Sequence, residues 1–311
     1  APPPAPRRRT DCECSRPAPP QFFDCSLLPN VTVIKALTPG AFKQVSIVQL
    51  QGRRYVMKAP KAMSGNIRKQ MAHSAVVNNP INRKMQIEKE YHSFREFETR
   101  AGFTPTFGMC ARSSASWALY FLGDQGHFGE VAALDTLTSS QALRMAHSVT
   151  KLHACFEDFI EPKKMNRAFL TRRGLATDKW WVYLMDNFPK QFVVDSEWNV
   201  YLADVDGVTV VHDRMLMRGG KKCPQPRACF DDVGQTAPAV PESFCLHGRC
   251  TGESRKSMVY MLGDRLLRLL VPRAPQLRPI LDATLIHDPN RRPTATEVEQ
   301  QIRALLNMSH C

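Results

Sequence analysis

Residues 186–207 read DNFPKQFVVDSEWNVYLADVDG and predict a β-hairpin with an acidic residue beyond each open end. Two short apolar runs, at 192–194 and 200–203, flank a polar segment that has the length of a hairpin turn. Antiparallel pairing of such runs brings the residue before the first strand beside the residue after the second. We therefore expect Gln191 and Asp204 to be neighbours.

Three polar residues around this hairpin have the order that phosphoryl transfer requires. Asp186 precedes Gln191 by five residues and Asp204 by 18 residues. This spacing resembles the protein-kinase catalytic loop, D-x-x-x-x-N, and the D-F-G metal site that follows it. One carboxylate then accepts the substrate hydroxyl proton, and a second carboxylate with an amide oxygen holds a divalent metal. We expect Asp186 to be the base, and Gln191 and Asp204 to be the metal ligands.

The same segment departs from the kinase pattern in three places. Gln191 replaces the usual Asn, Leu-Met-Asp at 184–186 replaces His-Arg-Asp, and Asp-Val-Asp at 204–206 replaces Asp-Phe-Gly. An ordinary surface hairpin with solvated aspartates is therefore the alternative interpretation.

Two segments nearer the N-terminus resemble the nucleotide-binding strands of kinases. Residues 37–45, LTPGAFKQV, align with the glycine-rich loop G-x-G-x-x-G-x-V through Gly40 and Val45, although two of the three glycines are missing. A Pro-Gly pair before a strand is also common in simple turns. Residues 55–58, YVMK, resemble the V-A-I-K strand, so we expect Lys58 to reach the nucleotide phosphates.

A predicted helix between these strands and the hairpin offers a partner for Lys58. Glu90 shares an apolar helical stripe with Phe94 and Phe97, which follow it at four and seven residues. A carboxylate on a buried face is costly unless it is paired, and Lys58 is the natural cation. Glu88 competes for this role, and an exposed surface charge is the simpler alternative for Glu90.

Near the C-terminus, residues 287–298, HDPNRRPTATEV, resemble the segment that opens the last helix of many kinase domains. Thr294 and Glu297 have the spacing of a capping box, in which each side chain bonds the backbone N–H of the other residue. All the kinase-like segments occur in the correct order along the chain. That order favours a kinase fold more strongly than any single match.

A narrower resemblance appears at 189–193, at 203–206 and in the cysteine-rich segment 245–253. These segments are similar to the divergent kinases of the secretory pathway, and the similarity extends over residues 37–306. It implies an ATP-dependent transferase that uses Mg²⁺ or Mn²⁺. Because related secreted proteins phosphorylate glycans, the resemblance leaves both protein and sugar acceptors open.

The resemblance also implies roles for individual residues. Lys58 would hold the nucleotide phosphates, Glu90 would orient Lys58, and Gly40 and Val45 would cover the nucleotide. Lys190 stands immediately before the amide residue, where tyrosine kinases usually carry Arg. Ser/Thr kinases place their basic residue two positions after the catalytic Asp, and that position is aromatic here. Lys190 therefore indicates a tyrosine acceptor.

We predict an α+β, two-lobed protein-kinase-like fold that follows a Pro-rich tail at 1–24. The N-terminal lobe, about residues 25–122, is expected to be small and β-rich. The C-terminal lobe, about residues 123–311, is expected to be helical, shortened and disulfide-rich. The smaller features that we expect are a loop insertion at 61–83, a helix near 84–99, a strand at 116–122, a hinge at 123–131, a buried core helix at 140–156 with structural roles for His147 and His153, and a basic insertion at 157–179.

The ten cysteines indicate an oxidising compartment. Their even number suggests disulfides, although sequence cannot give the connectivity. The segment 223–250 replaces the usual activation segment, and we expect its four cysteines to be oxidised. Zinc is the alternative, but the chain has no C-x-x-C pair, and His247 is the only histidine nearby. Asn30 and Asn307 begin glycosylation sequons. We expect a secreted protein, or one in the Golgi or ER lumen.

The net charge and the hydropathy limit the classes of partner that we expect for this chain. The net charge of +13 favours acidic partners, among them acidic glycans, whereas no nucleic-acid-binding motif is present, so we predict no nucleic-acid partner. No apolar run has the length of a membrane span, and no signal peptide is recognisable. The start at Ala1 without Met suggests a trimmed mature form.

Together these features predict an enzyme that transfers the γ-phosphate of ATP to tyrosines of secreted or extracellular-matrix proteins. Two alternatives remain. A glycan kinase would keep the same machinery and change only the acceptor pocket. A pseudokinase scaffold would bind partners without phosphoryl transfer, and the missing glycines point in that direction.

Overall fold

The computed structural model describes residues 19–37, 43–60, 80–97, 102–157, 180–184, 187–204, 208–212, 222, 245–246, 249–250, 255–286 and 288–307. Two predicted site residues, Gly40 and Asp186, lie outside these ranges. So do most of the predicted insertions and the cysteines at 12, 14, 223, 229 and 311.

A five-stranded antiparallel sheet forms the N-terminal part of the molecule, with the strand order β1-β2-β3-β5-β4. The chain enters it through a short 3-10 turn, η2 (Leu28–Asn30). The strands are β1 (Thr32–Ala36), β2 (Lys43–Leu50), β3 (Arg53–Pro60), β4 (Thr106–Ala111) and β5 (Ser116–Tyr120).

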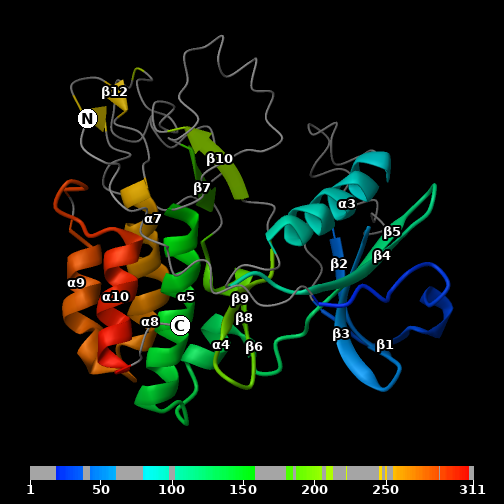
Figure 1. Cartoon of the computed structure of the whole chain (residues 1–311), viewed down its shortest axis with the longest axis horizontal. Helices are drawn as coiled ribbons and strands as arrows, with labels where there is room; N and C mark the ends of the chain where they lie inside the picture. Colours follow the sequence, from blue (N-terminus) through cyan, green and yellow to red (C-terminus); the bar gives the residue numbers. More distant parts are fainter. Residues whose placement is uncertain are drawn as a thin grey trace, which may run out of the picture.

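One face of this sheet is covered by helix α3 (Pro80–Phe97), which contacts β3, β4 and β5 (Figure 1). Ile87, Phe94 and Phe97 are buried on that side, as the predicted apolar stripe requires. The helix begins four residues before the predicted start at 84. Pro80 fits this earlier start because proline is favoured in the first turn, where its missing N–H costs nothing.

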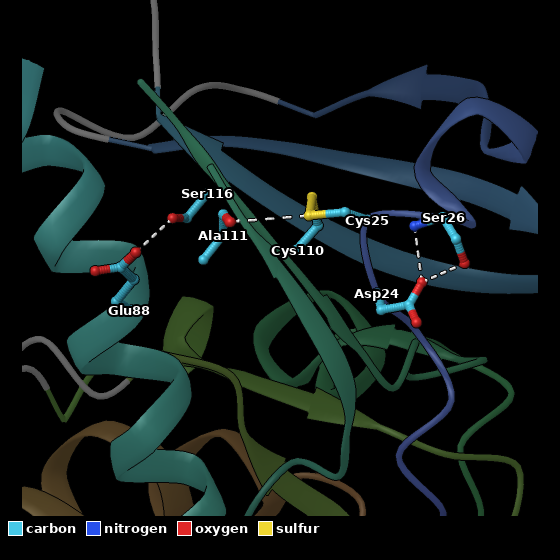
Figure 2. The surroundings of a disulfide bond; sticks show 7 residues. All are labelled: Asp24, Cys25, Ser26, Glu88, Cys110, Ala111 and Ser116. Atoms are coloured by element: carbon cyan, nitrogen blue, oxygen red, sulfur yellow. Dashed lines mark hydrogen bonds between the residues drawn. A yellow bond between two sulfur atoms is a disulfide. The ribbon is translucent and has the colours of Figure 1, made fainter. Parts of the chain in front are cut away.

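The opposite face of the sheet carries a second, smaller core beneath the segment that precedes β1. A disulfide between Cys25 and Cys110 ties this segment to β4 (Figure 2). Phe23 lies so close to Gly108, which has a φ of 139°, that a Cβ at Gly108 would be 2.0 Å from the Phe23 carbonyl oxygen. Only glycine permits this approach.

Helices dominate the second half of the chain and surround a larger core (Figure 1). The helical elements are α4 (Phe128–Ala132), α5 (Ser139–Glu157), α7 (Arg255–Leu262), the π-helical turn η6 (Gly263–Leu267), α8 (Arg268–Leu270), the 3-10 turn η7 (Pro275–Leu277), α9 (Arg278–Thr284) and α10 (Ala295–Leu305). Helix α5 is the predicted core helix, and it packs against α7, α10, β7 and β9.

Short strands lie among these helices. They are β6 (Gly126–His127), β7 (Trp180–Leu184), β8 (Phe192–Val194), β9 (Val200–Leu202), β10 (Val208–His212), β11 (Cys245–Leu246) and β12 (Arg249–Cys250). Strand β7 pairs with β10, and β6 pairs with β8. The segment predicted as a hinge therefore contains β6 and the start of α4, since pairing with β8 gives it regular structure.

Two local predictions in this half are confirmed. Thr294 caps α10, and the reciprocal bond from the Thr294 N–H to Glu297 completes the capping box. His147 and His153 on α5 both have structural partners. The His147 Nε2 lies 2.8 Å from Glu299 Oε1 on α10, and the His153 Nδ1 lies 2.7 Å from the Val149 carbonyl oxygen.

The observed architecture is thus a mixed α+β fold, with a small antiparallel sheet first and helices afterwards. The second half of the chain was also predicted to be rich in disulfides. The Cys25–Cys110 disulfide belongs to the N-terminal part of the molecule, whereas in the second half Cys155 of α5 is disulfide-bonded. Cys245 and Cys250 face each other across the β11–β12 pair. In the described part of the chain, no helix combines the length and the hydropathy that a membrane span needs.

Candidate functional site

The predicted hairpin is present. Strands β8 and β9 pair in antiparallel register, with Phe192 opposite Leu202. A 3-10 turn, η3 (Pro189–Gln191), leads into β8. At the open end, the Ala203 N–H donates to the Gln191 carbonyl oxygen over 2.7 Å. Gln191 is therefore opposite Ala203, one residue before the predicted neighbour Asp204, because β9 ends at Leu202 and not at 203.

The predicted partnership of Lys58 with Glu90 also forms. The Lys58 Nζ contacts Glu90 Oε1, and the two residues are only 5% and 2% exposed. The Lys58 ammonium also donates to the Ala203 carbonyl oxygen over 2.5 Å, and it lies 5.0 Å from the centre of the Tyr120 ring. Lys58 therefore joins the sheet and α3 to the segment that follows β9.

Glu88, the competing carboxylate, has a different environment. It accepts a hydrogen bond of 2.7 Å from the Ser116 hydroxyl (Figure 2). It also pairs with Lys84 one turn earlier on α3. Its side chain is one quarter exposed. The structure thus selects Glu90 over Glu88 as the partner of Lys58, because Glu90 lies on the buried stripe of the helix.

A second lysine enters the same cluster, and the sequence analysis did not identify it. The Lys43 Nζ lies 2.8 Å from Glu90 Oε2 and 3.0 Å from Asp204 Oδ1. Lys43 is 5% exposed. The available signal was its register in the sheet: Val45 is opposite Lys58, and residues two apart in a strand share a face. Lys43 must therefore lie on the same face as Lys58.

These four side chains form one ionic cluster, which we call the Lys43–Lys58–Glu90–Asp204 cluster. Two ammonium groups face two carboxylates, so their formal charges balance. Buried charges are costly unless they are paired in this way. The Asp204 side chain is 27% exposed and is therefore the member most open to solvent.

Asp204 and Gln191 are suitable for a hard divalent cation. In the described part of the chain, no three His, Cys, Asp or Glu side chains gather as a complete metal site. Mg²⁺, however, is usually held by one or two protein carboxylates together with substrate phosphates and water. The partly exposed carboxylate of Asp204 and the amide of half-buried Gln191 supply oxygens of the type in that donor set.

Residues 187–191, the described part of the segment predicted to be a catalytic loop, are anchored by the side chains of His153 and Arg265. Buried Asn187 donates from Nδ2 to His153 Nε2 over 2.9 Å, because the His153 Nδ1 hydrogen is directed to a carbonyl oxygen. The Arg265 guanidinium stacks 3.7 Å from the centre of the Phe188 ring. Burial lowers the pKa of His153 to about 4, against the weaker effect of its hydrogen bonds.

The remaining predicted residues have simple placements. Lys190 is exposed on η3. Val45 is half-buried on β2 opposite Lys58. Asp186 immediately precedes Asn187 but lies outside the described residues, as does Gly40.

A pocket of about 750 Å³ lies elsewhere, between α5, the β8–β9 turn and the end of α10. Arg144, Trp198 and Leu306 are among its lining residues. None of the predicted site residues lines it. Volume alone therefore does not locate the candidate site, which is defined instead by its buried ionic cluster.

Comparison of the sequence with models of protein families and with curated proteins gives no match. The functional assignment therefore rests on the residues of this chain and on their geometry.

Proposed function

We propose that this chain is a protein tyrosine kinase of the secretory pathway, with a divergent two-lobed kinase fold. The observation that carries the proposal is the buried contact of Lys58 with Glu90 beside Asp204. A cation from a strand, a carboxylate from a helix and a metal-type carboxylate after a hairpin come from distant parts of the chain. Kinases require this combination to hold a nucleotide and its metal.

The chemistry assigns one task to each residue. The Lys58 ammonium neutralises the nucleotide phosphates, and Glu90 fixes its position. Asp204 and Gln191 would hold the divalent cation, which would supply positive charge against the phosphates. Asp186 accepts the proton of the acceptor hydroxyl while that oxygen bonds to the γ-phosphorus. The bond from phosphorus to the β,γ-bridging oxygen breaks, and ADP carries away the electron pair.

Two further observations support the acceptor and the compartment. The exposed Lys190 stands where tyrosine kinases carry a basic residue beside the acceptor. The Cys25–Cys110 disulfide suits an oxidising compartment. The most specific segments of the sequence resemble the vertebrate lonesome kinase, a secretory-pathway protein tyrosine kinase. This resemblance implies that the acceptor is tyrosine in secreted proteins.

Radiolabelled ATP and a mixture of secreted proteins test the proposal. The wild-type chain should label tyrosine in the presence of Mg²⁺ or Mn²⁺, and Asp186→Asn should lose the activity by roughly 10²–10⁴-fold. Asp282→Asn is the matched control, because Asp282 is exposed on α9 and far along the chain from the cluster. Its labelling should equal that of the wild type.

Each other outcome has a definite meaning. Label on sugar instead of tyrosine would replace the protein acceptor with a glycan. Thermal stabilisation by nucleotide and metal without any transfer would favour the pseudokinase scaffold. If the wild-type chain neither transfers phosphate nor is stabilised by ATP with metal, the kinase assignment is wrong.

A further inference from the structure

Lys43 bridges two carboxylates that the proposed reaction uses separately. Its Nζ lies 2.8 Å from Glu90 Oε2 and 3.0 Å from Asp204 Oδ1. Lys58 holds the other oxygen of Glu90. The carboxylate of Glu90 is therefore shared by two ammonium groups, and the link from α3 to Asp204 runs through Lys43.

The position of Lys43 conflicts with a metal at Asp204. A divalent cation on the Asp204 carboxylate would lie beside an ammonium that is already 3.0 Å from the Oδ1 of that carboxylate. Like charges in a site of low water content repel strongly, so a bare metal ion binds against this repulsion. Lys43 therefore opposes metal binding as long as it remains on Asp204.

A nucleotide reverses this balance. A triphosphate carries more negative charge than one divalent cation neutralises, so an uncompensated anion remains after the metal has bound. Lys43 and Lys58 lie on the same face of the sheet and are both buried; Lys43 contacts Asp204, and Lys58 contacts the carbonyl of the preceding residue, Ala203. An ammonium released from Asp204 would then pair with a phosphate oxygen, in a charge-assisted hydrogen bond.

We propose that Lys43 is a second phosphate-binding lysine, which holds Asp204 in the free protein and moves to the nucleotide phosphates when metal and nucleotide bind together. This inference rests on the proposed function, because it takes the ligand to be a nucleoside triphosphate with a divalent cation. Its consequence is strong coupling: metal alone binds weakly, and metal with nucleotide binds well.

Substitution of Lys43 by Met separates this role from a purely structural one. Lys43→Met removes the competitor of the metal, so Mn²⁺ alone should bind about tenfold more tightly. The same substitution removes a phosphate partner, so a non-hydrolysable ATP analogue with Mn²⁺ should bind about tenfold more weakly. A variant that is merely misfolded would lose both affinities, whereas this inference requires opposite changes.

The experiment measures Mn²⁺ binding by electron paramagnetic resonance on the full chain, with and without the analogue. Lys35→Met is the matched control, because Lys35 is exposed on the neighbouring strand β1, and it should change neither affinity. Lys43→Arg keeps the charge and should resemble the wild type more than Lys43→Met does. Thermal unfolding of each variant confirms that it is folded.

Two failures can be told apart. If the wild-type chain binds the analogue, and a Lys43→Met variant that is shown to be folded leaves both affinities unchanged or lowers both, the role of Lys43 is wrong and the proposed function stands. If the wild-type chain binds no analogue at any Mn²⁺ concentration, the proposed function fails, and this inference fails with it.

Discussion

Acid should destabilise this protein through one buried histidine. His153 lies between the aromatic rings of Phe156 and Phe192, accepts from Asn187, and is fully buried. Its pKa in the folded protein is lowered to about 4, chiefly by burial. An exposed histidine in the unfolded chain has a pKa of about 6.5. The unfolded state therefore takes up the proton first as the pH falls.

The sign and the size of the effect follow from this difference. Since the folded pKa lies below the unfolded one, the stability is fully present above about pH 6.5 and is lost as the pH falls toward 4. Within that window the free energy of unfolding decreases by about 1.4 kcal/mol per pH unit. At pH 5.5 His153 alone should have removed about 1.4 kcal/mol. Glu297, whose pKa is lowered by its bonds to Thr294, loses its contribution only at lower pH.

Chemical denaturation at pH 7.5, 6.5 and 5.5 measures this loss. In His153→Gln, the side chain cannot titrate but keeps an acceptor for Asn187. We expect this variant to be less stable than the wild type at pH 7.5, and its free energy of unfolding to change less with pH. His92→Gln is the matched control, because His92 is exposed on α3. The difference between the wild type and His153→Gln isolates the single titration from those of the other histidines. Parallel curves for these two proteins would show that burial does not keep His153 neutral, and the reasoning would be refuted.

Two further predictions concern the sheet and α3. Glu90→Gln should lower the free energy of unfolding by about 3–5 kcal/mol, because Lys43 and Lys58 then lose a buried carboxylate; Glu88→Gln, which changes a partly exposed pair, should cost about 1 kcal/mol or less in the same denaturation experiment. Removal of the Cys25–Cys110 disulfide by a double substitution to Ser should cost roughly 2–4 kcal/mol. The bond closes a separation of 85 residues, and an unchanged unfolding midpoint would contradict its stabilising role.

Sequence patterns predicted those parts of the site that depend on local periodicity. The hairpin at 192–202 follows from two apolar runs and a polar turn, and each of its strands is only three residues long. Glu90 follows from the helical spacing of Phe94 and Phe97, which defines the buried stripe. In both cases, residues close in sequence determine which way a side chain points. For the helix these residues lie within about two turns, and for the strands they lie within the hairpin.

Lys43 and the disulfide could not be predicted in that way. In the glycine-rich-loop alignment, Lys43 stands at the position of the third glycine, and only the pairing of Val45 with Lys58 reveals which face it shares. Cys25 and Cys110 meet because the segment before β1 crosses to β4. That crossing is a matter of tertiary packing and leaves no local signal.

The turn of the hairpin fixes the geometry at its far, open end. Asp195 Oδ1 accepts from the N–H groups of Glu197 and Asn199, and its Oδ2 accepts from the Tyr201 hydroxyl. Within this turn Trp198 has a φ of 70°, a left-handed conformation that the bonds to Asp195 hold in place. A slip of one residue in the pairing would turn every side chain of a strand to the opposite face. Gln191 would then no longer lie opposite Ala203, and Asp204, which follows Ala203, would lose its position beside Lys43. The acidic residue that matters most for the register therefore lies in the turn, where sequence alone suggests only a solvated aspartate.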